Sequence, residues 1–80
     1  MIADLYYHPY LEEYVQVTNT AGTWVEFLVK RTNELRWLEL AVFKFAFRYY
    51  DQGDPIQVNL DELREQARDN NISIPREFNY

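Results

Sequence analysis

Residues 12–30 read EEYVQVTNTAGTWVEFLVK, and this stretch predicts a β-hairpin. Asn19 suits the first position of a type I turn, and Gly22 suits the later position whose positive φ forms a G1 bulge. A three-residue loop of this kind pairs Asn19 with Thr23. The two hairpin strands are therefore expected at about 13–18 and 23–30.

The register that this turn dictates gives one apolar face. Counting outward from the turn places Val17 opposite Val25 and Val15 opposite Phe27. Side chains alternate between the two faces of a strand, so the apolar residues at these positions share a face. That face holds Val15, Val17, Val25, Phe27 and Val29, whereas Tyr14, Trp24 and Leu28 lie on the opposite one.

A long helix is expected after the hairpin, at about 33–51. Thr32 can cap its first turn, and Gly53 followed by Asp54-Pro55 ends it. On a helical wheel the segment carries two apolar stripes. Leu35, Leu38, Val42, Phe45, Ala46 and Tyr49 form the first stripe, and Leu40, Phe43, Phe47 and Tyr50 form the second.

A short second helix is predicted over 60–69. Asn59 as the N-cap and Glu62 three residues later form a capping box, and Val58 is placed to pack against Leu63. The predicted fold is α+β: the hairpin packs on the 33–51 helix, with the 60–69 helix beside them in a single small domain, 1–80. Residues 1–9 are interpreted as an arm or an edge strand, because Pro9 restricts a strand to an edge, and 73–80 as a loosely held C-terminus.

An all-α fold is the alternative. Thr23 and Glu26 have the spacing of a capping box, which would begin one long helix over 24–51. The β-branched and aromatic residues of 23–29 favour a strand. Both interpretations stay open at the level of the sequence.

Composition limits the classes of function. The chain has 80 residues, no cysteine and a net charge of −5. A disulfide framework and a cysteine-based zinc site are therefore excluded. The negative charge disfavours direct binding to nucleic acid or to an anionic membrane. The N-terminus lacks a basic region followed by an apolar stretch, and no apolar run is long enough to span a bilayer, so the cytoplasm is the expected compartment.

No motif for catalysis, cofactor binding or metal binding is found. His8 is the one histidine, and no nucleophile lies in a triad-like setting. Residues 51–54 depart from the pattern of a calcium loop, and two glycines cannot build a phosphate loop. We expect a protein that is not an enzyme and has no cofactor.

The second stripe points to a partner. One interpretation is that the 60–69 helix and the N-terminal arm cover this stripe within the chain. That helix offers only Leu60, Leu63 and Ala67, however, so the functional hypothesis is that the stripe meets another chain, helped by Trp24 and Tyr14. The stripe residues concerned are Leu40, Phe43, Phe47 and Tyr50. The leading hypothesis is a small acidic protein that binds a protein partner through this helix face. In size and composition such chains resemble phage or mobile-element products that inhibit a host protein.

Two alternatives remain. The same stripe could close a homodimer, which would make the chain a self-associating structural subunit. An acidic patch could instead mimic nucleic acid and engage a basic surface on another protein, although Arg64 and Arg68 dilute it. The acidic residues concerned are Asp54, Asp61, Glu62, Glu65 and Asp69.

Overall fold

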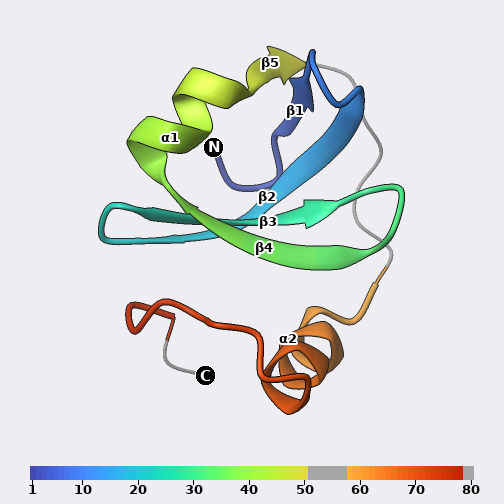
Figure 1. Ribbon diagram of the computed structural model, residues 1–80, viewed down its shortest axis with the longest axis vertical. Helices are drawn as coiled ribbons and strands as arrows, with labels where there is room; N and C mark the ends of the chain where they lie inside the picture. The colour runs from blue at the N-terminus through green and yellow to red at the C-terminus, as the bar shows by residue number, and fades with distance from the viewer. Residues whose placement is uncertain (51–57, 79–80) are drawn as a thin grey trace.

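The chain folds as a five-stranded antiparallel sheet with two short helices (Figure 1). The computed structural model describes residues 1–50 and 58–78. The strand order is β4-β3-β2-β1-β5. In chain order the elements are β1 (Leu5–His8), β2 (Glu13–Ala21), β3 (Trp24–Val29), β4 (Glu34–Glu39), α1 (Leu40–Ala46), β5 (Arg48–Tyr50) and α2 (Leu60–Asp69).

The sheet lies between two layers. Strands β1 to β4 form a meander, and α1 then crosses one face of the sheet and leads to β5, which pairs with β1 at the other edge. Helix α2 and the segment that follows it lie on the opposite face (Figure 1). The strands are therefore covered on both faces, in contrast to a hairpin that packs on one helix.

The predicted long helix at 33–51 is wrong, and the predicted fold with it. This segment is divided into β4, α1 and β5, and α1 is the only part of it that is helical. Asn33 has a φ of 57° and ends the turn between β3 and β4, so the residue expected to begin the helix belongs to a hairpin turn. The expected stop at Gly53 lies outside the described residues.

The error has a physical origin in the sheet's two covered faces. In β4, Leu35 and Trp37 point toward the α2 side, while Leu38 packs on the α1 side. A strand that is buried on both faces shows apolar residues in both alternating positions. Such a run resembles part of an apolar helix, so Leu35 and Leu38 of β4 were assigned to the first stripe. The second stripe contains no residue of β4 and comes from α1 and the residues after it.

The all-α alternative is also wrong, since residues 24–29 form β3 in the middle of the sheet. Strand β1 is internal as well, pairing with β2 on one side and β5 on the other. Pro9 does not interfere with this pairing, because β1 ends at His8.

The hairpin of β2 and β3 turns later than predicted. Ala21 pairs with Trp24, so the turn consists of Gly22 and Thr23 rather than residues 20–22. Gly22 has a φ of 58°, and Thr23 is not among the described residues with positive φ. A two-residue turn in which glycine comes first and is the central residue with positive φ is a type II′ turn. This turn type matches the twist of paired strands.

The apolar face of the hairpin is nevertheless preserved. Val15 pairs with Val29 instead of Phe27, an offset of two residues from the predicted register. A β-bulge between Val17 and Asn19 absorbs the remaining residue. Because side chains repeat every two residues, an even offset leaves each one on its original face.

That face builds the main core against α1. Phe43 of α1 is fully buried between Phe27 and Phe47, with ring centroids 5.3 Å and 4.6 Å away. Tyr6 of β1 meets Phe43 edge-on at 5.0 Å. This core cluster consists of Val15, Val17, Val25, Phe27, Val29, Phe43 and Phe47.

A buried ion pair joins the opposite face to α2. Glu26 of β3 has a relative exposure of 0%, and its carboxylate accepts hydrogen bonds from Arg64 Nη2 at 2.7 Å and Trp37 Nε1 at 3.1 Å. The Thr18 hydroxyl, at the bulge of β2, donates to the same carboxylate at 2.7 Å. Helix α2 itself begins as expected, with the Asn59 side chain accepting from the Glu62 N–H.

Candidate functional site

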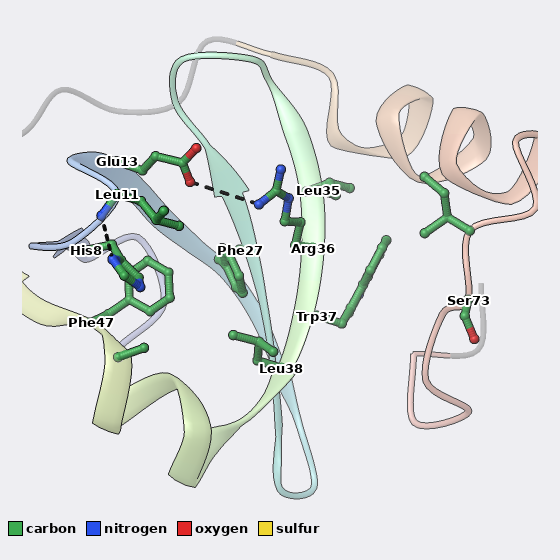
Figure 2. Close-up of a pocket in the computed structure, with 12 residues that line it drawn as sticks. His8, Leu11, Glu13, Phe27, Leu35, Arg36, Trp37, Leu38, Phe47 and Ser73 are labelled. Atoms are coloured by element: carbon green, nitrogen blue, oxygen red, sulfur yellow. Dashed lines mark hydrogen bonds and ion pairs between the residues drawn. The ribbon is translucent and has the colours of Figure 1, made fainter.

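A cavity of about 400 Å³ lies beside β4 and opens at the end of the core cluster. On the α1 side of β4 its walls are apolar and come from Leu11, Phe27, Leu38, Ala46 and Phe47. Around the strand it continues along Leu35, Trp37, Ile72 and Ser73. Figure 2 shows Phe27 and Phe47 on one side of the β4 ribbon and Trp37 and Ser73 on the other. This space is referred to below as the β4 cavity.

Charged side chains at the mouth of the β4 cavity are paired with one another. Glu13 accepts a hydrogen bond from Arg31 at 3.1 Å and lies 4.0 Å from Arg36. Arg36 also lies 3.5 Å from Glu34 on the same strand. These pairs are partly exposed, so each contributes little to stability. They leave the interior of the cavity predominantly apolar.

His8 shapes the wall of the cavity and is engaged through one ring nitrogen. Its Nδ1 accepts hydrogen bonds from the backbone N–H groups of Tyr10 and Leu11, at 3.2 Å and 3.0 Å. The ring meets Phe47 edge-on with centroids 5.1 Å apart. Since Nδ1 accepts, the neutral ring carries its proton on Nε2. Within residues 1–50 and 58–78, no group of three or more His, Cys, Asp or Glu side chains could hold a metal ion.

The outer edge of β4 presents backbone groups at alternate residues. The Leu40 N–H donates to the Thr23 carbonyl at 2.7 Å, so the backbone groups of Leu40 face the β3 side. Backbone groups of an antiparallel strand face alternate sides, so those of Leu35, Trp37 and Glu39 face away from β3. The Glu39 C=O begins the hydrogen bonding of α1, since Glu39 is the N-cap of that helix. The other outward groups form no backbone hydrogen bond with any described residue.

The structure separates the residues predicted to bind a partner. Phe43 and Phe47 belong to the core cluster, and Leu40 packs against it. Tyr50 and Tyr14 are partly exposed on the opposite face of the sheet, with ring centroids 5.1 Å apart. Trp24 is half-buried at the start of β3. Of the six, only Phe47 lines the β4 cavity.

Helix α1 turns other residues outward than those expected. Phe45 is 85% exposed and Val42 is 50% exposed. The side of α1 that carries Phe43 packs into the core, together with Phe47 just after the helix. The opposite side of so short a helix stays exposed to solvent.

The acidic patch lies on the exposed side of α2 and retains one contact with Arg64. Asp61, Glu62, Glu65 and Asp69 are all exposed on α2. Arg64 turns toward the sheet and bonds Glu26, and its Nη1 also lies 3.5 Å from the exposed Asp61 carboxylate. Arg68 is exposed among the remaining carboxylates. Asp54 lies outside the described residues.

The cavity and the free edge were missed because both depend on β4 being a strand. A helix over 33–51 has no unpaired edge, and it places Trp37 and Leu38 on adjacent sectors instead of opposite faces. The alternation of Leu35, Arg36 and Trp37 was the available signal.

Comparison of the chain with protein-family models, curated protein sequences and solved structures found no match. None of the helices in the described part of the chain has the length and apolar composition needed to cross a membrane.

Proposed function

We propose that this chain is a non-catalytic protein that binds a protein partner at the β4 cavity. The observation that carries the proposal is the coincidence of an apolar cavity of about 400 Å³ with an unpaired strand edge. Apolar hollows of this size are the usual form of small-molecule binding sites, and they can equally hold a side chain of a bound polypeptide. Exposed strand edges are places where another chain can add its own backbone.

The chemistry of the cavity favours a polypeptide over a small polar molecule. Its charged groups, Glu13 and Arg36, are already paired across the mouth. The free polar groups nearby belong to the backbone of β4 and repeat at every second residue. A polypeptide satisfies groups with that spacing, and its side chains can occupy the apolar interior.

The proposal moves the binding site from the helix face expected on sequence grounds to the space between α1 and β4. Phe43 belongs to the core cluster and packs against Phe47, which forms part of the cavity wall. Phe45 and Val42 on the outer side of α1 are not needed for binding under this proposal.

Filling the cavity tests the proposal. Ala46 lines it at the end of α1, so Ala46→Phe should place a ring inside it. Ala41→Phe is the matched control, because Ala41 is exposed near the start of the same helix and does not line the cavity. Each variant is immobilised and exposed to a lysate of the cells in which the protein naturally occurs. Circular dichroism verifies that each variant is folded.

We expect wild type and Ala41→Phe to retain the same partner and Ala46→Phe to lose it. Retention of that partner by a folded Ala46→Phe variant would refute the assignment of the site. If wild type captures only proteins that an unrelated control protein also captures, partner binding itself is refuted.

A second candidate function is mimicry of nucleic acid by α2, which is favoured by the inward turn of Arg64. With this guanidinium on Glu26 and beside Asp61, the carboxylates of Glu62, Glu65 and Asp69 are accompanied on the outer side by Arg68. Mimicry predicts capture of nucleic-acid-binding proteins that weakens steeply as salt is added, and that is lost in Glu62→Gln/Glu65→Gln. Capture that is insensitive to salt would exclude it.

A further inference from the structure

We propose that the β4 cavity takes an extended segment of another protein, which adds to β4 as a sixth, antiparallel strand and is basic on either side of an apolar anchor residue. This inference rests on the proposed function, because it specifies the chemistry of the partner at the same site. Three features of β4 support it: its free backbone groups, the position of the cavity and the charges at its two ends.

The free backbone groups determine how a new strand would lie. Leu35 and Trp37 direct their N–H and C=O groups outward, and Glu39 offers its N–H alone, because its C=O begins the hydrogen bonding of α1 as the N-cap. A partner strand can therefore form hydrogen bonds with these three residues. Every described strand pair in the sheet is antiparallel, and antiparallel pairing is slightly more stable per residue. The added strand would extend the sheet without disturbing β3.

The cavity then selects which residue of the segment is the anchor. Residues directly opposite each other in an antiparallel pair have side chains on the same face. A residue opposite Leu38 or Arg36 therefore points to the α1 side, where Phe27, Ala46 and Phe47 form the apolar wall. Its two neighbours point to the Trp37 side and make the backbone hydrogen bonds.

Charge favours a basic foreign segment over a second copy. Glu34 and Glu39 are exposed at the two ends of β4. Glu34 lies 3.5 Å from Arg36, whereas Glu39 has no ion pair with any described residue. Lysine or arginine on one side of the anchor would meet the unpaired Glu39, and on the other side would share Glu34 with Arg36. A second copy would instead bring an identical acidic strand and a net charge of −5 to this edge.

The first experiment defines the ligand with a probe. Random linear peptides displayed on phage are selected against the full-length protein, and the selected sequences are synthesised and titrated by fluorescence anisotropy. We expect sequences with an apolar anchor and flanking lysine or arginine, which compete with one another and do not bind Ala46→Phe. Selection of no linear peptide, or only of peptides that still bind Ala46→Phe, would overturn the inference.

Methylation of the peptide backbone tests strand addition directly. An N-methyl group removes one donor, so each residue of a selected peptide is methylated in turn. For antiparallel addition, affinity should fall at the two neighbours of the anchor and persist at the anchor itself. The opposite alternation would indicate parallel addition, which would support strand addition and overturn the orientation. Loss at every position or at none would overturn strand addition.

A substitution on β4 provides the complementary test. Glu39 has a φ of −64°, which proline adopts without strain, and its N–H faces outward. Glu39→Pro removes this donor together with the charge, whereas Glu39→Gln removes the charge alone. Losing one backbone hydrogen bond should weaken binding about tenfold. The loss in Glu39→Gln should disappear at high salt and the additional loss in Glu39→Pro should persist.

The outcomes separate this inference from the function on which it rests. If a cellular partner depends on Ala46 but no peptide shows the alternation, the site stands and the strand-addition inference fails. If folded Ala46→Phe retains its partner, the proposed function fails first. If wild type is a dimer and Glu39→Pro is monomeric, a second copy occupies the edge and the foreign segment is excluded.

Discussion

The Glu26 carboxylate lies 2.7 Å from Nη2 of Arg64 and joins the centre of the sheet to α2. Removing one partner of a buried ion pair leaves a charge that neither water nor a counterion stabilises. Arg64→Met should therefore lower the free energy of unfolding by about 3 kcal/mol, measured by urea denaturation. In the double variant Glu26→Gln/Arg64→Met the amide oxygen can accept from Trp37 while the amide NH2 donates to the Thr18 hydroxyl, so part of the loss should be recovered. A double variant as unstable as Arg64→Met would contradict the role of the uncompensated charge.

The turn at Gly22 gives a second prediction. Its φ of 58° is strained for any residue with a Cβ, although a Cβ there would make only an ordinary contact, 3.6 Å from the Glu77 Cγ. Gly22→Ala should therefore destabilise the fold by about 1–2 kcal/mol through the backbone alone. A chemically synthesised chain with D-alanine at this position should be as stable as wild type. Thermal denaturation followed by circular dichroism compares the two; equal losses would point to crowding instead.

Tyr6 predicts how stability responds to alkaline pH. Burial, followed by the nearby Asp4 and Tyr49, raises the pKa of Tyr6 above its usual value of 10.0. The unfolded chain then releases this proton at a lower pH than the folded chain does. The stabilisation is therefore complete below about pH 10 and is lost as pH rises through the folded-state pKa.

Comparison with Tyr6→Phe isolates this effect, because the other tyrosines remain in both proteins. Between about pH 9 and 11, the free energy of unfolding should fall less steeply with pH in Tyr6→Phe than in wild type. The difference should begin near the usual pKa of tyrosine and grow above it. Parallel curves for the two proteins would show that Tyr6 ionises equally in the folded and unfolded states.

The His8 ring gives a prediction for NMR. Because Nδ1 accepts from Tyr10 and Leu11, the neutral ring should be the Nε2–H tautomer, and long-range proton–nitrogen correlation should report Nδ1 as unprotonated. His8→Ala should lower the free energy of unfolding by about 1–2 kcal/mol, since two backbone donors lose their acceptor. Observation of the Nδ1–H tautomer would exclude this turn.

Short-range signals in the sequence located α2 and the two hairpin strands. The capping box at Asn59 and Glu62 is local chemistry, and it begins α2 at Leu60 as expected. The apolar face of the hairpin was also correct, even though its register was not. The offset between Val15 and its partner is even, and the bulge after Val17 makes it so.

Tertiary context decided the rest. Residues 34–39 are helix-like in composition, yet they lie between α1 and α2 in a sheet that is covered on both faces, and this covering overrides propensity. The candidate site follows from that difference. Phe47 was expected on the outer surface of a long helix, but the helix ends at Ala46 and Phe47 turns into the core cluster.

The pairing of β1 with β5 has a consequence for the order of folding. Tyr6 lies beside Tyr49, whereas the other described strand pairs join strands that are neighbours in sequence. Pairing strands that are distant in sequence is slow, because the chain loses the conformational entropy of the intervening loop before the new contacts compensate for it. The meander should therefore assemble early, with β5 added after the transition state. Substitutions at Tyr49 should accelerate unfolding and leave the refolding rate nearly unchanged.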